Sequence, residues 1–100
     1  MGDILLEWDS AKAQANVRKH GISFVFAGLV FEDPAYVEIE DDKHSTAEER
    51  RLAVGQIEGA IVTVVFTRRG QALRLISARP SSRRERKLYR QNMAQRSAAP

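Results

Sequence analysis

Three apolar segments in the second half of the chain, separated only by short links, constrain the fold more than any other feature. They cover residues 51–57, 60–67 and 72–79. Each has the length and the apolar content of a typical strand. Such short links join neighbouring strands only as antiparallel hairpins, because a parallel crossover needs a dozen or more residues. The sequence therefore predicts an antiparallel meander of three strands, with Glu58 and Gly59 as its first turn.

The register of the second hairpin follows from the side chains that it would pair. A slip of one residue turns every side chain of a strand to the opposite face of the sheet, so few registers keep the apolar residues together. A two-residue turn at Arg69 and Gly70 is one of them. It predicts Phe66 opposite Leu73, Val64 opposite Leu75 and Val62 opposite Ser77.

The N-terminal part of the chain predicts a short strand followed by a helix. Residues 4–8 are apolar enough for a strand, and Asp9 directly after them can accept hydrogen bonds from the free N–H groups of a helix over residues 10–20. Gly21 then ends this helix, since glycine is the usual residue after a helix C-terminus.

A second, shorter helix is expected to start after Ser23. Its apolar residues Phe24, Ala27, Gly28 and Phe31 recur at helical spacing. Asp33 and Pro34 interrupt it, residues 35–40 alternate like a half-buried strand, and the polar run 41–49 is typical of a loop.

The last expected element is a helix that begins in a capping box. Ser82 can accept a bond from the N–H three residues on, and Glu85 can reach back to the N–H of Ser82. We expect this helix to end near Asn92 and residues 93–100 to form a frayed tail. The expected order is β-α-α-β-β-β-β-α, an α+β fold on an antiparallel sheet, with one domain over residues 1–92.

Composition limits the classes of protein that remain. With 43% apolar and 29% charged residues in a chain of 100, one globular domain is expected. The absence of cysteine excludes disulfides, cysteine-bound zinc and thiol catalysis, and suits a reducing cytosol. The longest apolar run, residues 60–66, is too short for a bilayer, and the N-terminus lacks the pattern of a secretory signal. We expect a cytoplasmic protein without a membrane partner.

Charge is divided unevenly along the chain. The formal net charge of +3 combines −7 over residues 1–49 with +10 over residues 50–100, where Glu58 and Glu85 are the only acids. Eleven of the twelve bases in the second half are arginines, whose planar guanidinium fits two phosphate oxygens at once. This half could bind a phosphodiester, or it could be a solvated basic face that docks an acidic protein.

The end of the last strand has the densest group of candidate site residues. Arg79 is followed closely by Arg83, Arg84 and Glu85. Arg79 could also pair with an acid of the first half. Neighbouring cations should lower the pKa of Glu85, which could act as a base or simply cap the helix. Tyr89, one turn further on, could stack on an RNA base or lie in the core.

The histidines do not suggest a metal site. His20 and His44 lie 24 residues apart, without the spacing of a metal-binding pair. Either could be a general acid in a metal-free reaction, or a surface residue. No cofactor is expected.

Taken in order along the chain, a series of short motifs resembles the BrnT family of toxins. The motifs span roughly residues 5–90 and are spaced as in that family: Trp8-Asp9, Lys12, Asn16, Lys19-His20-Gly21, Phe24, Val30-Phe31, Asp33-Pro34, Asp42-Lys43-His44-Ser45, Glu49-Arg50, Gly55, Val64-Val65-Phe66-Thr67, Arg69, Ile76-Ser77-Ala78-Arg79, Glu85 and Tyr89. Val25, Phe26 and Pro80 depart from the family pattern.

The resemblance implies a RelE-like fold and a metal-independent ribonuclease that inhibits translation as the toxin of a type II toxin–antitoxin system. It implies a BrnA-type antitoxin with a ribbon-helix-helix domain, through which alone the complex would contact operator DNA. On this analogy the catalytic residues are Arg79, Arg68, Glu85 and Tyr89, and the RNA-binding residues are Arg50, Arg69, Arg83, Arg84, Lys19 and His20. Two other functions remain open: a binding module that cuts no bond, and a topoisomerase poison like the ParE toxins.

Overall fold

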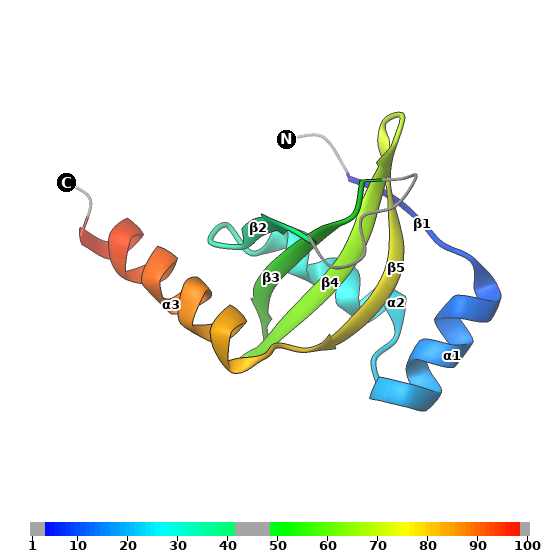
Figure 1. Ribbon diagram of the computed structural model, residues 1–100, viewed down its shortest axis with the longest axis horizontal. Coiled ribbons are helices and arrows are strands. Elements are labelled where there is room, and N and C mark those ends of the chain that lie inside the picture. Colours follow the sequence, from blue (N-terminus) through cyan, green and yellow to red (C-terminus); the bar gives the residue numbers. More distant parts are fainter. Residues whose placement is uncertain (1–3, 42–48, 99–100) are drawn as a thin grey trace.

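The computed structural model describes residues 4–41 and 49–98, and its elements follow the expected order (Figure 1). Most of the predicted loop over residues 41–49 lies outside the described residues, and so does His44. The fold is α+β. Its elements are β1 (Leu5–Glu7), α1 (Ser10–His20), α2 (Phe24–Ala27), the 3-10 helix η1 (Gly28–Glu32), β2 (Val37–Glu40), β3 (Arg51–Ile57), β4 (Ala60–Arg69), β5 (Ala72–Pro80) and α3 (Arg83–Ala98).

The five strands form one sheet in the order β1-β5-β4-β3-β2. The pairs β2–β3, β3–β4 and β4–β5 are antiparallel, as expected, whereas β1 pairs with β5 in parallel, with Leu5 opposite Ala72. The sheet is therefore mixed. Turn lengths do not predict this pair, because most of the chain lies between its two strands and no short turn fixes their direction.

The two hairpins of the meander were predicted with different success. The first turns at Glu58 and Gly59, as expected, and both residues have a positive φ, as a type I′ turn requires. The second turns at Gly70 and Gln71, so Arg69 lies opposite Ala72 and Phe66 lies opposite Leu75. The predicted register was wrong by two residues. Since side chains alternate with a period of two, this slip still leaves the apolar residues on one face.

A bulge between Val65 and Phe66 shifts the register once more, so that Val65 lies opposite Ser77 and Thr63 lies opposite Arg79. Alternation over residues 72–79 gives no sign of this extra residue, which explains why the pairing of Val62 with Ser77 was also wrong. Val62 instead lies opposite Pro80.

The caps of the first two helices form as predicted. The Asp9 carboxylate accepts a bond from the N–H of Lys12 at 3.0 Å, and Gly21 ends α1 with φ 71°. The Ser23 hydroxyl accepts from the N–H of Phe26, but α2 passes into η1 after one turn. The transition occurs at Gly28, where a Cβ atom would lie 2.5 Å from the Leu6 side chain. Glycine allows the helix to lie directly against β1.

Helix α3 is longer than predicted. The capping box forms, since the N–H of Glu85 donates to the Ser82 hydroxyl and the N–H of Ser82 donates to the Glu85 carboxylate. The helix then continues to Ala98, six residues beyond Asn92. The tail lacks an apolar face, but its alanine, glutamine, methionine and arginine are all good helix formers.

The core lies between one face of the sheet and the layer of α1, α2 and η1. Its buried residues include Phe24, Val30, Val64, Phe66 and Leu75. Helix α3 packs on the other face, where Tyr89 joins Ala35 and Val54 in a small second cluster. Figure 1 shows α3 leaving the end of β5 and extending away from the rest of the fold. Of the helices described, none is long and apolar enough to cross a membrane.

Candidate functional site

The candidate site is centred on an ion pair between the end of β5 and the first turn of α3. Two guanidinium nitrogens of Arg79 donate to the two carboxylate oxygens of Glu85, at 2.7 and 2.8 Å. The Glu85 side chain is 9% exposed, whereas that of Arg79 is 33% exposed. The carboxylate is therefore inside the fold, and the guanidinium reaches the surface.

Two further groups complete the surroundings of Glu85. The hydroxyl of Thr63, which is fully buried on β4, donates to Glu85 Oε1 at 2.9 Å, and the N–H of Ser82 donates to the same oxygen at 2.8 Å. The hydroxyls of Thr63 and Ser81 share a further hydrogen bond of 2.7 Å. Burial alone would raise the pKa of Glu85, but these bonds and the charge of Arg79 lower it to about 2.

This environment fixes what the pair can do chemically. A carboxylate whose pKa is about 2 is ionised at neutral pH but is a weak base, and its lone pairs here already accept four hydrogen bonds. The bonds that Arg79 donates to Glu85 raise the pKa of Arg79 and fix the orientation of its guanidinium. A guanidinium has five N–H donors. Glu85 takes two of those on Arg79, and the exposed part of the guanidinium can bind an anion.

From the first half of the chain, the charge of Asp41 also helps to raise the pKa of Arg79, although the ion pair itself is with Glu85. The first half also supplies a backbone clamp. Asn16, buried on α1, donates to the carbonyl of Ala78 and accepts from its N–H. The backbone directly before Arg79 is thereby tied to α1.

We call the Arg79–Glu85 pair and the residues that bond to it, Thr63 and Ser82, the Arg79 corner. Arg68 lies far from it. Along β4 it is five residues from Thr63, an odd number, so the two side chains point to opposite faces, roughly 17 Å apart along the strand. Arg68 donates to both oxygens of Glu38, which also accepts from Arg51. These bonds, led by that from Arg68, lower the pKa of Glu38. The structure thus does not bring Arg68 and Arg79 together.

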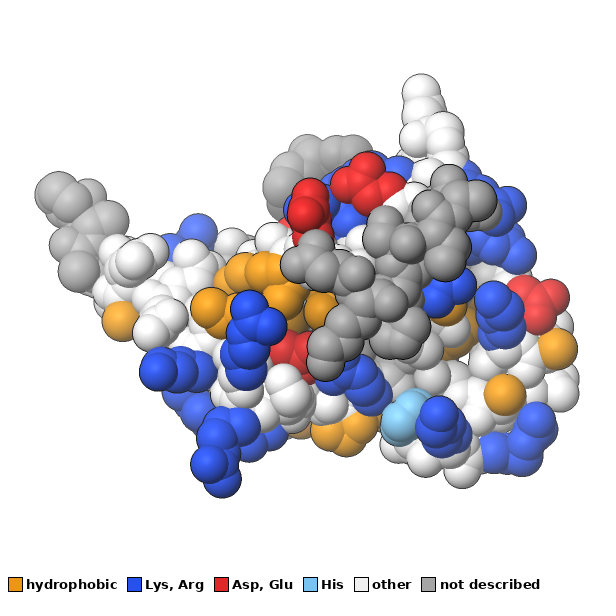
Figure 2. All heavy atoms as spheres, in the orientation of Figure 1, with side chains coloured by type: hydrophobic (Ala, Val, Ile, Leu, Met, Phe, Trp, Pro, Cys, Tyr) orange, Lys and Arg blue, Asp and Glu red, His pale blue; other side chains and the backbone are white. Residues whose placement is uncertain are grey.

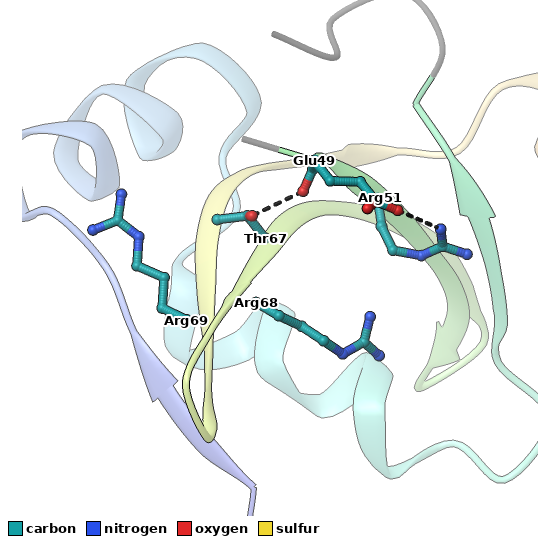
Figure 3. A pocket seen from close by; sticks show the side chains of 5 residues that line it. All are labelled: Glu49, Arg51, Thr67, Arg68 and Arg69. Carbon is teal, nitrogen blue, oxygen red and sulfur yellow. Dashed lines mark hydrogen bonds and ion pairs between the residues drawn. The ribbon is translucent and has the colours of Figure 1, made fainter. Parts of the chain in front are cut away.

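A hollow of about 300 Å³ lies beside Arg68 (Figure 3). The hairpin of β4 and β5 extends beyond the end of β3 here, and the Thr67 hydroxyl donates to the carbonyl of Glu49. Arg68 and Arg51 extend to one side of the hollow and Arg69 to the other. The lining residues are Glu49, Arg51, Thr67, Arg68 and Arg69.

Tyr89 lies in the core, which is the second of the two alternatives for this residue. It is 3% exposed, and its hydroxyl donates to the Asp33 carboxylate at 2.7 Å. Burial and this bond raise the pKa of Tyr89 to about 12. The ring is not accessible for stacking on an RNA base in this conformation.

The remaining predicted RNA-binding residues lie in three places. Arg83 and Arg84 are exposed at the start of α3, next to the Arg79 corner. Lys19 and His20 follow Asn16 by three and four residues, so they share its face of α1 and lie towards β5. Arg50 precedes β3 and is half-buried.

Sequence reasoning did not find Thr63, Ser81 or the role of Asn16. Thr63 is the single polar residue in the apolar run over residues 60–66, and nothing in that run indicates that it faces a carboxylate. Only the bulge in the β4–β5 pairing puts it opposite Arg79. Among the residues described, no group of three or more acidic or histidine side chains could hold a metal ion.

The fold and the site describe a small α+β protein whose basic side chains gather around a fixed arginine, an arrangement suited to an anionic substrate. Comparison with known proteins makes the class specific. Residues 8–85 match the family model described as "Ribonuclease toxin, BrnT, of type II toxin-antitoxin system". The chain belongs to this family, and it is a ribonuclease toxin whose partner is an antitoxin. No curated protein matched the chain.

Proposed function

We propose that the protein is a metal-independent endoribonuclease of RelE-like fold that stops translation by cutting RNA at the Arg79 corner. One observation carries this proposal: Arg79 is held by a buried, ionised Glu85 while the rest of its guanidinium reaches the surface. An oriented cation of this kind stabilises charge that develops on a phosphate, and it does so without reorganising during the reaction.

In the proposed reaction the 2′-oxygen of a ribose attacks the adjacent phosphorus and the bond to the 5′-oxygen breaks, which leaves a 2′,3′-cyclic phosphate. The 2′-hydroxyl proton passes to water, and the leaving 5′-oxygen takes a proton from water. Arg79 binds the non-bridging oxygens, on which negative charge increases. Glu85 is a positioning residue in this scheme, because its oxygens are already occupied and its pKa of about 2 makes it a weak base.

The other basic residues would hold the RNA on either side of the cut. Arg83 and Arg84 are the best placed, since they are exposed and follow Arg79 within five residues. Lys19 and His20 approach from α1. Arg68, Arg69 and Arg50 would contact a more distant part of the RNA near the hollow, and Tyr89 would support the site from the core.

We further propose that the partner is a BrnA-type antitoxin with a ribbon-helix-helix domain, that operator DNA is bound through it alone, and that the system works in the cytoplasm. The family supports an antitoxin. Exposed apolar side chains on α2 and η1, Val25 at 72% and Leu29 at 39% exposure, offer a surface for it.

The test is to incubate the purified, antitoxin-free chain with RNA in the presence of EDTA. We expect cleavage, products that end in a 2′,3′-cyclic phosphate, and arrest of a cell-free translation reaction that added antitoxin reverses. Intact RNA would contradict the proposal, and so would activity that EDTA abolishes. Growth arrest with DNA damage and intact RNA would favour a topoisomerase target instead.

A further inference from the structure

Helix α3 is strongly basic. Between Arg83 and Arg96 it has six cations and one acid, Glu85, which is turned inward to Arg79. Figure 2 shows blue side chains gathered over the first half of α3, near the junction of β5 and α3 that Figure 1 shows. The cations are Arg83, Arg84, Arg86, Lys87, Arg90 and Arg96.

Helical spacing divides α3 into an inner and an outer face. Glu85, Tyr89 and Asn92, at i, i+4 and i+7, lie on the inner face. They form hydrogen bonds to Thr63 of β4 and to Asp33 and Ala35 in the segment before β2. Arg83, Lys87 and Arg90 have the same spacing on the opposite side of the helix, and all three are exposed. We call these three residues the outer strip. It extends about 10 Å along the helix, roughly the length that three consecutive phosphates of one nucleic-acid strand occupy.

The outer strip does not serve the stability of α3. Like charges one turn apart repel each other, and cations in the first turn of a helix oppose its dipole. No described ion pair joins the strip to an acid. Because these cations are unfavourable for the helix itself, we infer that they serve to bind an anionic partner.

The character of the strip favours RNA over an acidic protein. Protein interfaces have a core that is poor in charge and rich in apolar groups, whereas the first exposed apolar side chain on α3 is Met93, beyond the strip. Nucleic-acid interfaces are more strongly positive. The outer strip is also close to Arg79 along the chain, because α3 starts three residues after Pro80, the last residue of β5.

We propose that the outer strip, Arg83, Lys87 and Arg90, binds the phosphates of single-stranded RNA that flanks the cleaved bond. This inference rests on the proposed function, since it takes the bond at Arg79 as the point from which the RNA continues. Lys87 and Arg90 thereby join the substrate-binding surface. They make the affinity depend on the length of RNA beyond the cut.

The test measures how binding of uncleavable 2′-O-methyl oligonucleotides of 12 and 4 nucleotides depends on salt. The double variant Lys87→Gln, Arg90→Gln is compared with Lys12→Gln, Arg18→Gln, which removes the same charge from exposed positions on α1. Each lost phosphate contact lowers the slope of log affinity against log salt by about 0.7. We expect the α3 variant to lose about 1.4 from the slope for the 12-mer and little for the 4-mer, and the α1 variant to keep both slopes.

Equal losses in the two double variants would overturn the inference, because the effect would then be one of net charge. An unchanged slope for the α3 variant would also overturn it and would leave an acidic protein as the partner of the strip. Cleavage of RNA by the parent protein is scored separately. If the parent cuts RNA and the slope does not change, the inference alone fails; if it does not cut RNA, the proposed function fails.

Discussion

The side-chain amide of Asn16 closes both backbone hydrogen bonds of Ala78. Its Nδ2 donates to the Ala78 carbonyl at 2.9 Å, and its Oδ1 accepts from the Ala78 N–H at 3.0 Å. Strand β1 pairs with β5 only as far as Arg74, so Asn16 takes the place of a neighbouring strand at Ala78. The first helix thereby fixes the backbone that aims Arg79.

Replacing Asn16 should cost more stability than any surface change on α1. Asn16→Ala leaves the Ala78 N–H and carbonyl and the Ile22 carbonyl without their partner, and an unsatisfied buried polar group costs about 1–3 kcal/mol. We expect a loss of about 2–4 kcal/mol in the free energy of unfolding in urea. Gln14→Ala, at an exposed position of the same helix, should change it by less than about 0.5 kcal/mol. Equal effects would contradict the clamp.

The stability of the protein should depend on the ionisation of Glu85. Its pKa is lowered from 4.5 to about 2 in the folded state, so the ionised form favours folding. The contribution, about 3 kcal/mol, is complete above pH 5 and is lost as the pH falls from about 4.5 to 2.

The variant Glu85→Gln measures this linkage. The difference in unfolding free energy between the parent and Glu85→Gln should be largest at pH 7 and should decrease towards pH 2. Glu32→Gln removes an exposed carboxylate from η1 and serves as the control; its stability should follow the parent across this range. A difference between the parent and Glu85→Gln that stays constant with pH would show that the charge of Glu85 does not contribute.

The hydroxyl of Thr63 is predicted to contribute to the stability of the protein and to the low pKa of Glu85, beyond what the volume of the side chain contributes. Thr63→Val keeps the volume but removes the bonds to Glu85 and Ser81. We expect a loss of about 1–2 kcal/mol in unfolding free energy and a higher pKa for Glu85, visible in NMR titration of its carboxyl carbon. Thr63→Ser retains the hydroxyl and should keep the pKa of Glu85 near that of the parent. Identical titrations for both variants would argue against the hydrogen bond.

The start of α3 should show opposite effects on stability and on RNA binding. A cation at the first turn of a helix opposes the helix dipole, and an acid favours it by about 0.3–1 kcal/mol. Arg84→Glu, on an exposed side chain, is therefore expected to raise the melting temperature slightly while it weakens RNA binding. A variant that loses both properties would indicate that Arg84 has a structural role.

Local signals in the sequence predicted most of the fold because each acts within a few residues. The caps at Asp9, Ser23 and Ser82 and the turn at Glu58 all formed as expected. The parallel pairing of β1 with β5 and the bulge after Val65 depend on distant segments, and no local pattern encodes them.

The candidate site divides in the same way. Glu85 and Arg79 are six residues apart, and their proximity followed from the chain connection. The contacts of Thr63 and Asn16 cross 22 and 62 residues and were not predicted. Arg68, which lies near the end of the neighbouring strand, was predicted by analogy with the family to act together with Arg79. Alternation along β4 turns its side chain to the opposite face of the sheet.

The central claim is that Arg79, held by Glu85, stabilises the charge that develops on the cleaved phosphate. Single-turnover cleavage of RNA by the Arg79→Ala variant in EDTA tests it most directly, with Arg18→Ala, an exposed arginine of α1, as the matched control. Loss of one such contact typically costs about 3 kcal/mol of barrier. We predict a rate at least about a hundredfold below that of the parent for Arg79→Ala, and an unchanged rate for Arg18→Ala. A folded Arg79→Ala protein that cuts RNA as fast as the parent would contradict the account.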